Sequence, residues 1–189
     1  TALYPGDPPT QLAPFASWGE AGYRASRLSL SVHAGTHVDA PLHLSPGGAD
    51  AASLPLRALV GPAQVIDCQA TGVVTRRLLA AAAPLAPRLL LKTGGGSSLR
   101  SGGAGRGHLA ADAAAWLVAG GVLLVGIESL SIDAVGAEDL PAHRALLAAG
   151  VVVLEGVDLD QAQAGAGELV CLPLPLVGSD GAPARVLLR

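Results

Sequence analysis

Short apolar runs bounded by glycine, proline or polar residues are the main structural signal along this chain. Runs of this length are typical of buried strands, and a strict alternation of polar and apolar residues is typical of a half-buried strand. Residues 27–32 show the alternating pattern, and the other runs are mainly apolar. We predict strands at residues 27–32, 64–68, 88–93, 122–127, 151–155, 168–172 and 184–188.

Three longer windows between these runs have helical character. They cover residues 75–83, 110–119 and 141–149, and proline or glycine follows each of them. Pro141 suits a first helical turn, where its missing N–H costs nothing. Strands and helices mixed in this way predict a layered α/β fold, without the regular order of a repeated βαβ array.

Composition limits the protein class. The 189 residues are 50% hydrophobic, so we expect one domain spanning residues 1–189 with a sizeable core. Twelve Lys and Arg against fifteen Asp and Glu leave no basic stripe, which argues against nucleic-acid binding. No apolar run reaches the roughly 18 residues of a membrane span, and no basic segment precedes an apolar leader, so we expect a cytoplasmic protein that does not enter a membrane.

The cysteines and aromatic residues are few and unevenly placed. Cys68 and Cys171 lie far apart, which excludes a disulfide framework and predicts two buried thiols. Four of the five aromatic residues fall within residues 1–24: Tyr4, Phe15, Trp18 and Tyr23. They could fix the N-terminal segment to the core, form the wall of a pocket for a flat substrate, or do both, with Trp18 a candidate substrate contact.

The segment at residues 94–107 stands out because it is rich in glycine and serine. It contains seven glycines and three serines in fourteen residues, so it can bury little apolar area. We predict a mobile loop here. The segment lacks the Lys-Ser or Lys-Thr pair that follows the glycines of a phosphate-binding loop.

Three of the five histidines cluster within eleven residues, as His33, His37 and His43. A helix would place the first two on one face, but Gly35 and Pro41 disfavour a helix here. An extended chain directs positions 33, 35, 37 and 39 to one side. On this interpretation two imidazoles and the Asp39 carboxylate converge on one point, whereas the alternative is histidines that simply face solvent or the core.

Two imidazoles and a carboxylate are common ligands of zinc-like ions, and three protein ligands leave a position open for catalysis. His43 follows the turn expected at Pro41, so we predict that it misses the ligand row and acts as a general acid and base. His143 and Glu155 form a second candidate pair. Glu155 closes an apolar run, where a metal, a cationic partner or exposure at the strand end would each satisfy it.

The segment from His33 to His43, His-Ala-Gly-Thr-His-Val-Asp-Ala-Pro-Leu-His, resembles the motif of the metal-dependent cyclase-like hydrolases, which include bacterial-type kynurenine formamidases. Further likenesses follow in order along nearly the whole chain, around residues 4–7, 89–93, 125–133, 142–144, 154–157 and 172–175. Two features depart from the formamidase pattern: the glycine-rich segment at residues 94–107, and Glu128 at a position that is commonly Asp. Neither departure involves a candidate metal ligand.

The resemblance implies a swivelling β/α fold, a homodimer or larger homo-oligomer, and two divalent ions, zinc or manganese. It implies that the ligands are His33, His37, Asp39, His143 and Glu155, with Asp39 bridging the two ions, and that His43 is catalytic. The expected reaction is hydrolysis of a small aromatic amide, N-formyl-L-kynurenine, to kynurenine and formate. The alternatives are an isatin-type cyclic-amide hydrolase or another hydrolase of the cyclase family, an inactive metal-binding or small-molecule-binding module, and a structural zinc domain. A structural zinc domain is disfavoured because neither cysteine lies near the motif.

Overall fold

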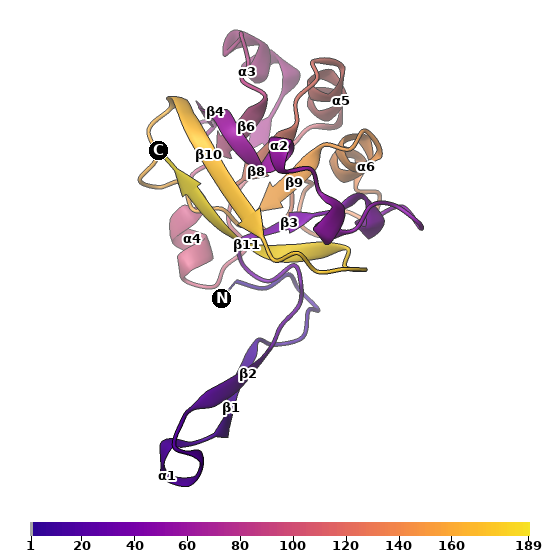
Figure 1. The fold of residues 1–189 in the computed structure, drawn as a ribbon. Helices are drawn as coiled ribbons and strands as arrows, with labels where there is room; N and C mark the ends of the chain where they lie inside the picture. Colours follow the sequence, from indigo (N-terminus) through magenta and orange to yellow (C-terminus); the bar gives the residue numbers. More distant parts are fainter. Residues whose placement is uncertain (1) are drawn as a thin grey trace.

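The centre of the protein is a closed barrel of seven strands, in a computed structural model that describes residues 2–189 (Figure 1). Its spatial order is β10-β11-β3-β9-β8-β6-β4. Four neighbouring strands are parallel: β4 (Val60–Asp67), β6 (Arg88–Lys92), β8 (Leu124–Ile127) and β9 (Val152–Glu155). Three antiparallel strands close the barrel: β3 (His37–Asp39), β10 (Gly165–Pro173) and β11 (Gly181–Leu188).

Three of the parallel strands, β6, β8 and β9, are buried on both faces, which explains their mainly apolar sequences. Side chains alternate between the two sides of a strand. In β6, Leu89 and Leu91 therefore pack toward the outer helices, whereas Leu90 packs inside the barrel. The outer layer consists of α3 (Arg76–Ala81), α5 (Ala111–Ala119) and α6 (Pro141–Ala148). These helices lie along one side of the barrel (Figure 1).

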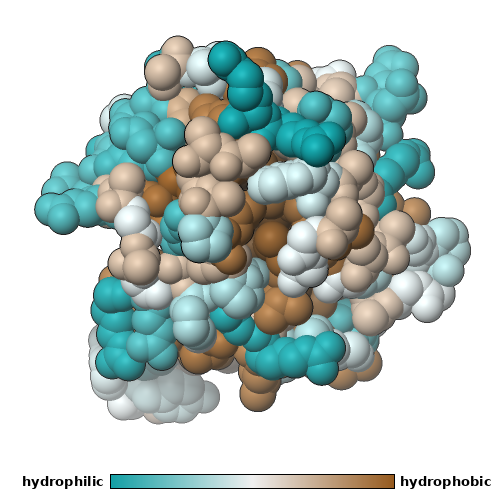
Figure 2. Space-filling view, turned by 90° about the horizontal axis from the view of Figure 1, so that it is seen from above, coloured by the Kyte–Doolittle hydropathy of each residue, from teal (hydrophilic) through white to brown (hydrophobic). Residues whose placement is uncertain are grey.

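Short elements connect the strands of the barrel. Two 3-10 turns, η1 (Pro41–His43) and η2 (Ala51–Ser53), precede α2 (Leu56–Leu59), and buried residues of α2 pack into the barrel interior. Two-residue strands β5 (Val73–Val74) and β7 (His108–Leu109) pair in parallel outside the barrel. Seen from above, hydrophilic and hydrophobic side chains mix on the surface, and the hydrophobic ones gather toward its middle (Figure 2).

Residues 11–29 form an arm that projects away from the barrel (Figure 1). The arm is a hairpin of β1 (Gln11–Ala16) and β2 (Ala25–Ser29), with the short helix α1 (Trp18–Ala21) at its tip. The prediction of a half-buried strand at residues 27–32 is wrong in its burial and end point. All of β2 except its first residue is exposed, because the alternating apolar residues have no core of their own chain beneath them.

The glycine-rich segment at residues 94–107 is folded, which corrects the prediction of a mobile loop. It begins with α4 (Gly96–Arg100) and is held to the end of β8 by backbone hydrogen bonds, such as Arg106 N–H to the Glu128 carbonyl at 3.0 Å. A Cβ atom on Gly95 would lie 2.0 Å from that same carbonyl oxygen. Glycine is required here because backbones approach closely, a use of the residue that composition alone does not distinguish from flexibility.

The other predicted elements are confirmed within a few residues. Six of the seven strands match β4, β6, β8, β9, β10 and β11, and the three helices match α3, α5 and α6. The mixed α/β class is also confirmed, although closure of the sheet into a barrel was not anticipated. Both cysteines are buried thiols, as expected. Among the described residues, no helix has the length and apolar character needed to cross a membrane.

Candidate metal centre

Strand pairing brings the candidate ligands together at one end of the barrel. His37 of β3 lies opposite Glu155 of β9, and Asp39 lies opposite Gly181 of β11. His143 comes from the first turn of α6, which Pro141 begins. Residues that are distant in the sequence therefore meet because β3 lies between β9 and β11 in the barrel.

His33 reaches the same site by a different route from the one predicted. It lies in a turn before β3, and Gly35 within this turn has a φ of +68°, a value that glycine adopts without strain. His33 Nδ1 nevertheless lies 2.9 Å from Asp39 Oδ1. The predicted convergence of His33, His37 and Asp39 is thus present, but a turn produces it and the period of an extended strand does not.

The two carboxylate oxygens of Asp39 face two different sets of ligands. Oδ1 lies 2.9 Å from His33 Nδ1 and 3.4 Å from His37 Nε2. Oδ2 lies 3.3 Å from His143 Nε2, which in turn lies 3.0 Å from Glu155 Oε1. The five groups form two overlapping clusters that share Asp39, and each cluster is compact enough for one ion.

The chemistry of the site fits divalent metal ions. His37 Nε2 and Asp39 Oδ2 are buried and have no hydrogen-bond partner. An unpaired buried polar atom is costly, and a metal ion would satisfy both atoms. Three imidazole nitrogens and two carboxylates are a typical ligand set for zinc or manganese.

The pKa values of the buried site residues indicate the same need for positive charge. Burial lowers the pKa of His37, but the neighbouring carboxylates of Asp39 and Glu155 raise it to about 10. Burial also lowers the pKa of His143, which Asp133, Asp39 and Glu155 raise to about 12. Burial raises the pKa of Asp39, yet the surrounding histidines His143, His33 and His37 hold it well below the usual range. These shifts indicate that the buried carboxylates of the site favour positive charge beside them.

Residues behind the ligands fix their orientation. Asp133 Oδ2 lies 2.7 Å from His143 Nδ1, and the Asp133 carboxylate also accepts the backbone N–H groups of Ala142 and His143. His37 Nδ1 lies 2.9 Å from the Gly35 carbonyl oxygen. Such contacts set the tautomer of a ligating histidine and direct its other nitrogen toward the metal. Asp133 lies in the segment 125–133 that resembles the family, but the sequence did not predict a role for it.

His43 and Asp180 lie at the more exposed rim of the site. His43 ends η1 and stands outside the row of buried ligands, as the turn at Pro41 predicted. Its ring lies 4.5 Å from the ring of His33, measured between centroids. Asp180 Oδ2 lies 3.2 Å from His43 Nδ1 and 2.9 Å from His33 Nε2. Nothing in the sequence pattern singles out Asp180, because only the pairing of β11 with β3 brings it here.

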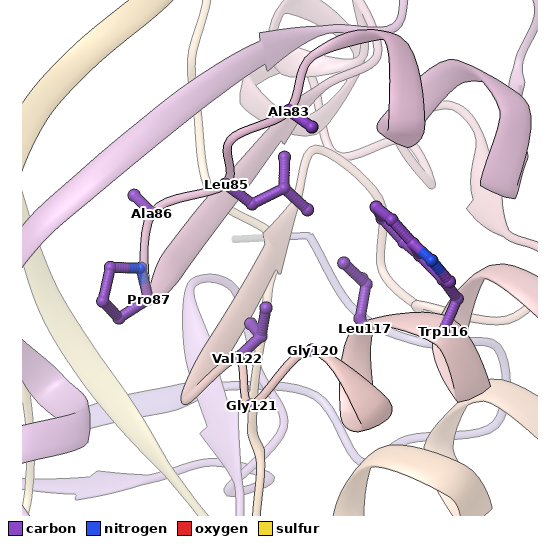
Figure 3. A pocket seen from close by; sticks show the side chains of 9 residues that line it. All are labelled: Ala83, Leu85, Ala86, Pro87, Trp116, Leu117, Gly120, Gly121 and Val122. Carbon is purple, nitrogen blue, oxygen red and sulfur yellow. The ribbon is translucent and has the colours of Figure 1, made fainter.

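These groups open onto a pocket of about 250 Å³, and its wall includes His33, His43, His143 and Glu155. Tyr4 also lines the pocket, and its hydroxyl accepts the Gly136 N–H at 2.8 Å. A second hollow lies beside the C-terminal end of α5, where Trp116 faces Leu85 and Val122 (Figure 3). No acidic, basic or histidine side chain lines that second hollow, so it offers no candidate metal ligand or proton carrier.

The structure does not bring Trp18 to the pocket of its own chain. Trp18 lies in α1 at the tip of the arm and is 70% exposed, and Phe15 and Tyr23 on the same arm are also exposed. Of the four aromatic residues near the N-terminus, only Tyr4 is placed where it contacts the pocket. Within one chain, the three arm residues neither pack on the core nor form the pocket wall, so a contact of Trp18 with substrate stays a prediction.

Comparison with known proteins agrees with this geometry. A family model described as "Putative cyclase" matches residues 2–134. The chain is 40% identical to a kynurenine formamidase of Salinibacter ruber over 100% of this chain and 92% of that protein. A solved structure described as a potential metal-dependent hydrolase with cyclase activity superposes with a TM-score of 0.83 and 34% identity, over 99% of this chain and 90% of that one. Isatin hydrolase A of Labrenzia aggregata gives a TM-score of 0.82 and 25% identity, over 100% of this chain and 87% of its own. The chain therefore belongs to the cyclase family of proteins.

Proposed function

We propose that this protein is a metal-dependent hydrolase that converts N-formyl-L-kynurenine to L-kynurenine and formate. The observation that carries the proposal is the likeness to a kynurenine formamidase over the whole chain, in a protein that also gathers the five candidate ligands and His43 at one pocket. The reaction adds water across a formyl C–N bond. It needs an activated nucleophile, a polarised carbonyl and a proton for the departing nitrogen.

The proposed site binds two divalent ions, zinc or manganese. His33, His37 and Asp39 would hold one ion, while Asp39, His143 and Glu155 would hold the other, which is the division that the two Asp39 oxygens support. When bound, such ions provide a nucleophile at neutral pH and polarise the formyl carbonyl. Asp133 and the Gly35 carbonyl hold His143 and His37 in place for this role.

His43 is the proposed general acid and base. It lines the pocket but lies outside both ligand sets that include Asp39. Its imidazole takes a proton from the attacking water and then gives one to the nitrogen of the departing arylamine. The second transfer matters because the anion of an arylamine is a poor leaving group. Formate and the free amine are then the two products.

An isatin-type cyclic-amide hydrolase is the second candidate reaction. A structure of an isatin hydrolase superposes almost as well as that of the potential metal-dependent hydrolase, but its sequence identity to this chain is 25% against 40% for the formamidase. The higher identity to the formamidase over the whole chain favours the linear amide. A module without catalytic activity is disfavoured because all the candidate ligands and His43 face one site.

The proposed assembly is a homodimer in which the arm packs on a second copy. A hairpin of two strands is at best marginally stable when it stands alone in water. The arm nevertheless exposes Leu12, Phe15 and Trp18, each at least 70% accessible. The body offers a matching apolar strip of exposed residues at Leu174 and Val177, shortly before Asp180 at the rim of the pocket. An arm docked on that strip would bring Trp18 of one copy toward the pocket of the other.

The decisive experiment measures metal content and hydrolysis of N-formylkynurenine on protein purified without chelator. We expect bound divalent metal, turnover that chelation abolishes, and recovery when zinc or manganese is returned. Metal with turnover of isatin in place of the formamide would favour the cyclic-amide reaction. A protein that binds no divalent metal after reconstitution would contradict the ligand assignment itself.

Two variants separate the proposed roles within the site. Asp39→Asn should lose metal and turnover together, because Asp39 faces both ligand sets. His43→Ala should keep its metal and lose turnover by roughly 10²- to 10⁴-fold, the usual contribution of a general acid and base. A His43→Ala protein that loses its metal, or that retains full turnover, would contradict the role of His43.

A further inference from the structure

The Asp180 carboxylate contacts two histidines of the site with a single oxygen. Asp180 Oδ2 lies 3.2 Å from His43 Nδ1 and 2.9 Å from His33 Nε2. An ionised carboxylate only accepts hydrogen bonds, so the nitrogen that faces it on each ring must carry the proton. For a neutral His43, this contact favours the tautomer with the proton on Nδ1 and the lone pair on Nε2.

The backbone around Asp180 is held firmly in place. The Asp180 carbonyl accepts the Ala40 N–H at 2.9 Å, and Gly181 pairs with Asp39 in the barrel. A Cβ atom on Gly181 would lie 2.8 Å from His33 Cε1, so the missing side chain lets the strand approach the imidazole. Asp50 Oδ2 accepts the Gly178 N–H at 2.6 Å and fixes the preceding loop.

The same contact joins the proposed acid and base to the metal ligands. His33 Nδ1 faces Asp39 Oδ1 at 2.9 Å, on the side where His37 also lies. If this nitrogen binds the ion, His33 Nε2–H donates to Asp180, which is the usual arrangement of a carboxylate behind a ligating histidine. One carboxylate would then orient both a ligand and the proton carrier.

We propose that Asp180 is a positioning residue that holds the His43 ring so that Nε2 can exchange protons with the reactants. This role rests on the proposed hydrolase function. His43 Nε2 accepts a proton as water attacks the formyl carbon, and it returns a proton to the amide nitrogen as the C–N bond breaks. The negative charge of Asp180 stabilises the imidazolium that forms between the two transfers.

The first test needs no enzyme activity. Long-range ¹H–¹⁵N NMR of metal-free protein, at a pH where the His43 ring is neutral, reports which ring nitrogen carries the proton. The His43 signals are identified as those that disappear in His43→Ala. We expect the Nδ1–H tautomer in the unmodified protein and a shift toward Nε2–H in Asp180→Asn. An unchanged tautomer in Asp180→Asn would overturn the proposal.

The second test is a double-mutant cycle, measured at saturating metal with metal content checked for each variant. Asp180→Asn should lower kcat by roughly 10- to 100-fold and leave KM within about twofold, because it disturbs orientation and removes no substrate contact. In the His43→Ala background, Asp180→Asn should lower kcat by less than about a further twofold. The proposal would be overturned if the two losses of kcat multiplied in full, or if the loss of kcat in Asp180→Asn were matched by an equal loss of bound metal.

A matched control distinguishes the Asp180 side chain from the loop that carries it. Asp50→Asn weakens the anchor of the same loop at Gly178 but removes no contact with either histidine. We expect this variant to retain wild-type kcat and the wild-type His43 tautomer. An equal deficit in Asp50→Asn would assign the effect to the loop. If the unmodified protein hydrolyses no formamide, the proposed function fails, while the NMR result still decides the role of Asp180.

Discussion

The glycine-rich segment at residues 94–107 and the aromatic arm at residues 11–29 each differ from what their composition suggests. Glycine and serine suggest a loose loop, and aromatic residues suggest a buried segment. The glycine-rich segment packs tightly against the barrel, with Gly95 in contact with the backbone of Glu128. The arm carries large apolar side chains and leaves them exposed, including Phe15 and Trp18. A high glycine content therefore accompanies close backbone packing in one region. In the other region, a high aromatic content accompanies a surface that its own chain does not cover.

The largest predicted effect is a difference in stability between the two regions when glycine is replaced by alanine in each. Gly95 has φ −96° and ψ −9°, which any residue adopts, so an added methyl group is opposed only by packing. That methyl group would lie 2.0 Å from the Glu128 carbonyl oxygen and 2.5 Å from Arg106 N. We expect Gly95→Ala to lower the free energy of unfolding by at least about 3 kcal/mol, measured by denaturant titration.

Gly19 in the arm is the matched control for Gly95. It lies in α1, and a Cβ atom added to it would meet no other atom within 4 Å. Gly19→Ala should change stability by less than about 1 kcal/mol, with a small gain where helix propensity dominates. Equal destabilisation by the two substitutions would contradict the distinction between a packed segment and a free arm.

The second prediction concerns the exposed apolar side chains of the arm. Phe15→Ser combined with Trp18→Ser should weaken self-association by at least about 30-fold, because a buried aromatic contact contributes about 2 kcal/mol at an interface. Light scattering across a dilution series would measure the change as a shift from dimer to monomer. The metal content of the variant should stay at the wild-type value, since neither side chain contacts a candidate ligand in the chain.

A monomeric wild-type protein at all concentrations would contradict this prediction and the proposed assembly together. The matched control is Leu56→Ser, which alters an exposed apolar residue on the body. This substitution removes a side chain of similar exposure from a position outside the arm and the apolar strip. We expect it to leave self-association unchanged.

The sequence predicted the parts of the structure that depend on local pattern. The apolar runs located six barrel strands, and proline or glycine located the ends of three helices. The grouping of His33, His37 and Asp39 was also predicted, although a turn at Gly35 creates it. Local pattern is informative in these cases because burial on a strand or helix face leaves a periodic trace.

Features that depend on contacts across the chain were not predictable in this way. Asp180 reaches His43 only because β11 pairs with β3, and no residue near Asp180 carries a periodic or motif signal for that meeting. Closure of the barrel likewise depends on the pairing of β10 with β4. Glycine can serve either flexibility or close backbone packing, and composition does not distinguish the two. The packing of residues 94–107 was therefore not predictable either.

The smallest predicted effect concerns Glu128, the side chain that fastens the glycine-rich segment. Its Oε2 accepts the Gly94 N–H at 2.7 Å, and its Oε1 accepts the Leu159 N–H at 2.8 Å. In Glu128→Gln one of these oxygens becomes an NH₂ group that faces an N–H donor, so one buried donor loses its acceptor. We expect stability to fall by about 1–3 kcal/mol, measured by denaturant titration. Glu20→Gln in the arm changes an exposed side chain with one weak contact and should alter stability by less than about 0.5 kcal/mol. A loss in Glu20→Gln that equals the loss in Glu128→Gln would mean that the arm is fixed as firmly as the glycine-rich segment, even in the absence of contacts with its own barrel.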